Sequence, residues 1–160
     1  MIYTGNWESW NDPEKVAPLK YTFKVTNPGT YKLYLRSFKK LNGEGDKHND
    51  CFILVEGDFT AGTPNICISD FDKASPSATN YYLNKKTKFF GGSNVDWVNN
   101  GKLDAHSIKP SAVYEFKANE TYTLTVTGRS TGYHIDRILF VDLNKYSHSE
   151  VTGILKLLVY

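Results

Sequence analysis

The sequence predicts an all-β protein, folded as a single-domain jelly-roll β-sandwich of two antiparallel sheets. Short runs rich in Tyr, Thr, Phe and Val alternate apolar with polar residues, which favours strands. Gly, Pro, Asn and Asp recur between these runs, as they do in turns. A chain of 160 residues also suits one domain around one core. Many short strands with frequent turns are typical of sandwiches and barrels rather than helical bundles.

The predicted strands follow from this alternation, taken along the chain. Leu19, Tyr21 and Phe23 fall on one face of the first strand, which predicts a half-buried strand. The last strand is apolar on both faces, which predicts a central strand that is buried on both sides. Residues 1–144 are predicted to form the domain, and 145–160 either an extra strand or a disordered tail. The predicted strands are residues 19–25, 31–36, 51–55, 65–69, 81–83, 87–90, 112–116, 121–128 and 133–142.

Charge and composition bear on the class of partner. The net charge is +2 and no block of five like charges occurs, so nothing predicts a nucleic-acid partner. Lys85, Lys86 and Lys88 form a local basic patch. No apolar stretch of membrane-spanning length is present, so no membrane partner is expected. Residues 1–5 do not have the basic start of a signal peptide. Cys51 and Cys67 either remain two buried thiols or pair as a disulfide.

No motif in the chain predicts catalysis. Hydrolysis of a glycosidic bond needs two carboxylates at a defined separation. The chain has several aspartates, but no motif pairs them, and its histidines lack the spacing of metal ligands. A nucleophile elbow, a phosphate-binding loop and a C-x-x-C pair are also missing from the sequence.

The most informative stretch is the polar loop between the strands predicted at 31–36 and 51–55. Arg36 lies at its start, and His48, Asn49 and Asp50 lie at its end. Such side chains can recognise hydroxyl groups, or a sulfate if Arg36 faces outward. Alternatively, Asp50 is structural and pairs with Arg36 or with a buried Arg137. Because loops held by rigid strands often bind ligands, the sequence predicts a polar binding surface here.

Several segments together indicate a family. The chain resembles non-catalytic carbohydrate-binding modules of the family-six-like β-sandwich group, in particular modules appended to agarases and porphyranases of marine bacteria. The resemblance covers roughly residues 5–142, and the GRS-x-G-aromatic-x-IDRI stretch is its most specific part. The segments that carry it are GNWESWND at 5–12, GTYKLYLRS at 29–37, KHND at 47–50, the isolated Trp97, and TYTLTVTGRSTGYHIDRILFV at 121–141.

The resemblance implies a jelly-roll sandwich that is secreted, has no catalytic activity and binds algal galactan or its oligosaccharides. It also implies a catalytic domain in the same parent chain. Modules of the wider group often hold a structural calcium ion, so calcium is the cofactor that it implies. The start of this chain lacks the acidic first strand that often supplies calcium ligands, so no metal ligand is assigned.

Sugar binding needs flat aromatic faces, which stack on the C–H side of a pyranose, and planar polar groups. Trp97 is predicted as the stacking platform, with the alternative that it caps the edge of the core. One of Trp7 and Trp10 is expected to fold back as a lid on the sandwich. Arg129 and Ser130 are expected in an exposed loop, whereas Asp136 and Arg137 are read as structural. The candidate sugar-binding residues are Trp97, His48, Asn49, Arg36, Asp50, Trp10, Arg129 and Asn99.

Three functional hypotheses follow. The first is a monomeric carbohydrate-binding module that holds a glycoside hydrolase on algal galactan. The second is a small carbohydrate-active enzyme. The third is a structural sandwich that packs against a catalytic domain, which a large exposed apolar patch would favour.

Overall fold

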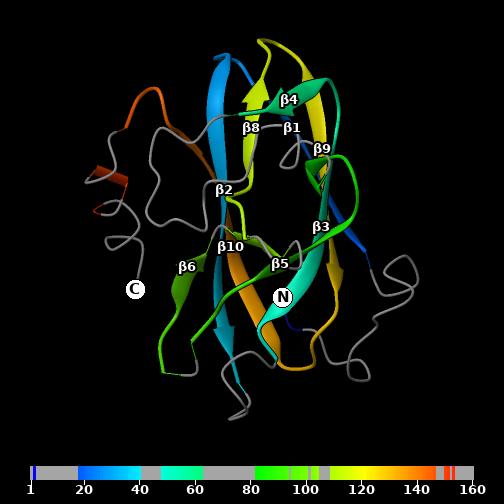
Figure 1. The fold of residues 1–160 in the computed structure, drawn as a ribbon, viewed down its shortest axis with the longest axis vertical. Helices are drawn as coiled ribbons and strands as arrows, with labels where there is room; N and C mark the ends of the chain where they lie inside the picture. Colours follow the sequence, from blue (N-terminus) through cyan, green and yellow to red (C-terminus); the bar gives the residue numbers. More distant parts are fainter. Residues whose placement is uncertain are drawn as a thin grey trace.

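The prediction of an all-β sandwich is confirmed. The computed structural model describes residues 2, 18–40, 48–62, 82–93, 95–100, 102–104, 109–146, 150–151 and 153. Its strands form two antiparallel five-stranded sheets that lie face to face (Figure 1). The strands are β1 (Leu19–Lys24), β2 (Gly29–Lys39), β3 (Asp50–Glu56), β4 (Phe59–Ala61), β5 (Thr87–Phe90), β6 (Val98–Asn100), β7 (Lys102–Asp104), β8 (Val113–Phe116), β9 (Thr121–Gly128) and β10 (Tyr133–Asp142).

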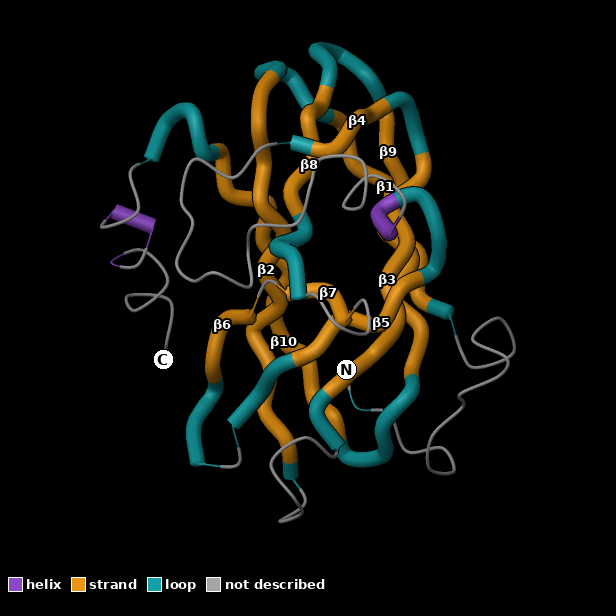
Figure 2. Tube along the Cα trace, in the orientation of Figure 1, coloured by secondary structure: helices purple, strands orange, loops and turns teal. Residues whose placement is uncertain are grey.

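Consecutive strands alternate between the two sheets along the whole chain. The first sheet has the order β1-β9-β3-β5-β7, and the second has the order β10-β2-β8-β4, with β6 also paired to β2. Each connection between named strands therefore crosses from one sheet to the other, as in a jelly roll (Figure 2). Because β2 and β3 belong to different sheets, the loop between them joins two layers of the sandwich.

The core lies between the sheets and is largely aromatic at one end. Phe116 lies at its centre, with ring centroids 4.4 Å from Tyr122 and 5.4 Å from Phe140. Leu33 and Leu35 of β2 point into the same core and are fully buried. The residues at odd positions of β2 therefore face inward, and those at even positions face the outer side of the second sheet.

The last strand departs from the prediction. β10 is the end strand of its sheet in the described structure and pairs with β2, so it is not central. Its register with β2 shifts between Ile135 and Arg137, which makes Asp136 an extra residue in a β-bulge. The bulge reverses the alternation: Ile135 before it and Ile138 after it both pack against the core. Without knowledge of the bulge, the strand reads as apolar on both faces.

Several shorter elements also differ from the prediction. Tyr82 and Leu83 are helical rather than extended. β4, β6 and β7 were not predicted, and the strand predicted at 65–69 lies outside the described residues. β1 is present, but it is an end strand whose first residues are exposed, so only its last part packs on the core. The predicted buried face therefore holds for Phe23 and not for Tyr21, which is 41% exposed.

The described part of the predicted tail is helical at residues 150–151 and 153. Val151 is buried against Tyr34 and Val141, on the outer side of the second sheet. The tail therefore covers part of that sheet, and its described residues form no extra strand. Cys51 is a buried free thiol, and burial raises its pKa, whereas Cys67 lies outside the described residues. None of the helical segments described is both long and apolar enough to span a membrane.

Candidate functional site

The predicted binding residues lie on two opposite faces of the sandwich. Arg36 belongs to the second sheet, and Asp50 belongs to the first. Both strands alternate, and the side chains next to Arg36 and Asp50 point into the common core, so Arg36 and Asp50 themselves point away from it in opposite directions. The expectation of one polar wall along the loop is therefore wrong, because the loop connects two sheets.

Three of the predicted residues meet on the outer side of the second sheet. Arg36 pairs in register with Asn99 of β6, and Trp97 lies just before that strand. The guanidinium carbon of Arg36 lies 5.5 Å from the centroid of the Trp97 ring. Trp97 is partly exposed, so it is not a core residue. We call the surface formed by Arg36, Phe38, Trp97, Asn99, His134 and Asp136 the tryptophan face.

Asp136 fixes the position of Arg36 on this face. The Arg36 Nε donates to Asp136 Oδ1 at 2.8 Å, and its Nη2 forms an ion pair with Oδ2. The hydrogen bond with Asp136 raises the pKa of Arg36, in spite of partial desolvation. The Asp136 side chain is 32% exposed, whereas that of Arg36 is 7% exposed. The β-bulge therefore places a solvent-accessible carboxylate beside the guanidinium that lies near the indole ring.

Two rings of the underlying sheet support the indole. The ring centroid of Phe38 lies 5.8 Å from that of Trp97, and the ring of His134 lies 6.3 Å away, edge to face. Phe38 and His134 pair in register on β2 and β10. Burial lowers the pKa of His134, and the charge of Lys40 lowers it further, so the ring is neutral near pH 7.

Arg36 was expected at the start of the loop, but it lies within β2, because this strand continues to Lys39. The pairing of Lys39 with Tyr133 extends the strand beyond the predicted end. Val98–Asn100 form a strand, so Trp97 leads directly into β6. The sheet surface beyond Arg36 is covered, since Tyr34 is buried beneath Val151.

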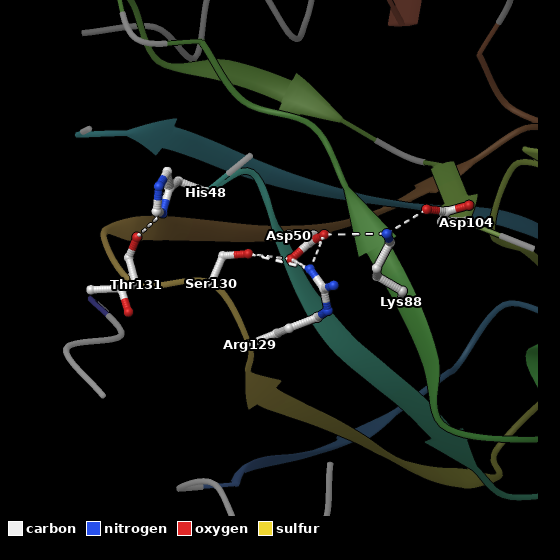
Figure 3. A network of polar contacts seen from close by, with 7 residues as sticks. All are labelled: His48, Asp50, Lys88, Asp104, Arg129, Ser130 and Thr131. Atoms are coloured by element: carbon white, nitrogen blue, oxygen red, sulfur yellow. Dashed lines mark hydrogen bonds and ion pairs between the residues drawn. The ribbon is translucent and has the colours of Figure 1, made fainter. Parts of the chain in front are cut away.

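A second polar cluster lies on the outer side of the first sheet. Arg129 forms an ion pair with Asp50, and both side chains are only 2% exposed. Ser130 Oγ donates to the same carboxylate, and Lys88 Nζ lies 3.5 Å from it and 2.5 Å from Asp104 Oδ2 (Figure 3). The expectation that Arg129 and Ser130 are exposed is wrong, because the Asp50 carboxylate draws both side chains into the sheet. The partner of Asp50 is thus neither Arg36 nor Arg137.

The His48–Asn49 corner lies next to this cluster. His48 has a positive φ of 58°, and its Nδ1 donates to the carbonyl oxygen of Thr131 at 3.1 Å. Asn49 is 9% exposed, and its carbonyl oxygen accepts from the Gly91 N–H at 2.8 Å. Figure 3 shows the contact of His48 with Thr131. The corner is therefore held by the neighbouring segments at Thr131 and Gly91, and of His48 and Asn49 only His48 is partly open to solvent.

The remaining predictions concern Trp10 and calcium. Trp10 and Trp7 lie outside the described residues. Among the residues that are described, no group of three or more His, Cys, Asp or Glu is placed to hold a metal ion.

Sequence reasoning missed Phe38 and His134 and read Asp136 as purely structural. Continuing the alternation from Tyr34 and Arg36 would have placed Phe38 on the same face. No comparable signal was available for His134, because its direction depends on which strand pairs with β10. Comparisons of the chain with protein-family models, with curated proteins and with solved structures found no match.

Proposed function

We propose that this protein is a non-catalytic, secreted carbohydrate-binding module that attaches a parent glycoside hydrolase to algal galactan of the agarose or porphyran type. The observation that carries the proposal is the tryptophan face. There, a partly exposed indole lies beside a guanidinium, a carboxylate and an amide on one side of a rigid sheet.

The indole supplies the apolar contact. Arg36, Phe38 and His134 all belong to the sheet that supports Trp97, so the ligand stacks on the ring face that points away from the sheet. A ring held by three neighbours loses little freedom on binding. This preorganisation favours a flat pyranose over a flexible chain.

The polar groups supply the orientation. Asp136 accepts hydrogen bonds from sugar hydroxyls through its solvent-accessible carboxylate. A groove of about 290 Å³ adjoins Asp136 and is lined by Tyr21, Ile135, Arg137 and Ile138. We propose that a second sugar unit lies in this groove, with Tyr21 as its aromatic contact.

The carboxylates near these sites support a binding role rather than hydrolysis. Asp136 is engaged with Arg36, Asp50 with Arg129, and Asp104 with Lys88. A module without activity is still useful to a linked hydrolase, because tethering raises the effective concentration of the enzyme at the polymer. Monomeric binding is sufficient for this role.

Affinity electrophoresis in gels with and without agarose or porphyran tests the proposal. The wild type should be retarded, and Trp97→Ala should bind about 30-fold more weakly, since losing a tryptophan anchor costs on the order of 2 kcal/mol. Tyr82→Ala is the matched control in neutral agarose, because Tyr82 is a partly exposed aromatic in the helical segment before β5, outside the tryptophan face. Thermal unfolding of each variant checks that the sandwich is intact.

Equal retardation of Trp97→Ala and the wild type would refute the choice of site. Unchanged mobility in every galactan would refute the binding role and leave the structural sandwich as the alternative. Release of reducing ends or unsaturated products by this chain alone would establish the enzyme alternative instead.

A further inference from the structure

The contacts of the tryptophan face continue past it, to the edge of the sandwich. The Trp97 ring centroid lies 5.5 Å from the Arg36 guanidinium carbon, and Arg36 is bound to Asp136. Asp136 also lines the groove of about 290 Å³ that Tyr21 of β1 lines as well. Each of these residues therefore neighbours the next, and we call the series Trp97, Arg36, Asp136 and Tyr21 the transverse line.

The transverse line runs across the strands rather than along one of them. β2 carries Arg36 and lies between β6, which follows Trp97, and β10, which carries Asp136 (Figure 1). Neighbouring strands lie about 5 Å apart, so these three strands alone span about 10 Å. Tyr21 lies past β10, on the end strand of the other sheet. The line is therefore longer than one sugar ring.

Exposed apolar residues lie at both ends of the transverse line. Val95 is 77% exposed and comes two residues before Trp97, in a turn where its N–H donates to Ser93 Oγ at 3.1 Å. At the other end, Tyr21 is 41% exposed, and Leu19, which lies on the same side of β1, is 40% exposed. Three of the four large hydrophobic side chains that are exposed in the described part of the chain therefore lie at the ends of this line.

The exposure of these ends bears on which part of a glycan fits. A site for a chain end needs a wall at which the terminal ring stops, and such a wall would cover the side chains next to it. Val95 and Tyr21 are too exposed to lie against a wall of this kind. An open row of apolar side chains instead suits the C–H faces of successive rings. The chain can thus enter at one end of the line and leave at the other.

We propose that the transverse line binds an internal segment of the galactan chain, several sugar units long, rather than a chain end. Trp97 stacks on one ring, Asp136 accepts from hydroxyl groups near the middle, and Tyr21 contacts a ring at the edge of the sandwich. Val95 extends the apolar contact past the indole. This inference rests on the galactan binding proposed above, and it adds which part of the polymer is recognised.

Soluble fractions of agarose or porphyran with different defined chain lengths test the proposal. Sedimentation velocity measures how many protein molecules bind to one chain at saturation. Internal recognition predicts that this number rises in proportion to chain length, because each added segment is a new site. A number that stays the same at every length would overturn the inference and leave the galactan-binding function intact. Absence of binding at every length would instead refute the proposed function, and this inference with it.

Variants at the two ends test the position of the line. Tyr21→Ala should weaken binding to the longer fractions about fivefold and Val95→Ser about twofold, since each removes an apolar contact. Tyr82→Ala is again the matched control, and thermal unfolding checks that each variant is folded. Unchanged binding of both variants to the longer fractions would overturn the line. Self-association of the free protein that Tyr21→Ala abolishes would also overturn it and assign this edge to a second copy of the chain.

Discussion

Among the described residues, an arginine–aspartate pair lies on each outer face of the sandwich, and the pairs Arg36–Asp136 and Arg129–Asp50 differ in burial. The side chains of Arg129 and Asp50 are each 2% exposed, and Ser130 and Lys88 add further contacts to the carboxylate. Arg36 is 7% exposed, but its partner Asp136 is 32% exposed. The same chemical groups therefore form a closed network on one sheet and a half-open one on the other.

This difference in burial indicates which of the two pairs is able to contact a ligand. A buried pair that loses one partner leaves an uncompensated charge, so the Asp50 network stabilises the fold and has little capacity left for a ligand. A pair with an accessible carboxylate can exchange water for sugar hydroxyls. The accessible carboxylate of the tryptophan face is therefore the better candidate for contact with a ligand.

The largest expected effect is that of Asp50→Ala. It leaves Arg129 buried without its carboxylate and should lower the free energy of unfolding by about 3–5 kcal/mol. Urea denaturation followed by circular dichroism measures this change. A loss below about 1 kcal/mol would remove the distinction between the two pairs.

Asp136→Ala should have a small effect on stability and a large effect on galactan binding. Because solvent reaches this pair, we expect a stability loss of about 1–2 kcal/mol, between the values for surface and buried pairs. Galactan retardation should nevertheless be lost, since the variant removes the accessible acceptor. Asp136→Asn keeps one acceptor oxygen and should retain part of the binding. Normal retardation of Asp136→Ala would show that Asp136 is structural, as Asp50 is.

Phe38→Ala should weaken galactan binding by about 1 kcal/mol, or roughly fivefold, through loss of the ring that supports Trp97. Tyr21→Ala should have a similar effect only if the ligand extends into the groove beside Asp136. Isothermal titration with oligosaccharides of increasing length distinguishes the effects of the Phe38 and Tyr21 variants. The Tyr21 variant should differ from the wild type only with the longer ligands.

The smallest expected effect is a pH dependence due to His134. Its pKa is lowered in the folded protein, first by burial and then by Lys40, so the unfolded chain binds a proton more readily. Stability should therefore be unaffected above pH 6.5 and should fall as the pH drops from about 6.5 through the lowered folded pKa. In His134→Phe, the fall in melting temperature over this range should be smaller. An equal fall in both proteins would assign it to other groups.

The sequence predicted strands well where the apolar pattern is unbroken. The run that became β3 is continuously apolar, and the run that became β9 alternates with a period of two; their predicted ranges, 51–55 and 121–128, match the strands closely. It predicted the site less well, because the direction of a side chain is set by the partner strand. Trp97, Asn99 and Arg36, which were chosen by residue type, do lie together, but their grouping with Asp50 failed because β2 and β3 belong to different sheets.

The bulge at Asp136 makes the core and the tryptophan face depend on a single inserted position. Removing that residue would restore uninterrupted pairing of β10 with β2, and every side chain on one side of the deletion would then turn to the opposite face. Either Tyr133 and Ile135 or Ile138 and Phe140 would leave the interior. Length variation at this position is therefore far less tolerable than substitution: exchanging the side chain changes only its contact with Arg36, whereas losing the residue removes half of the strand's packing on the core.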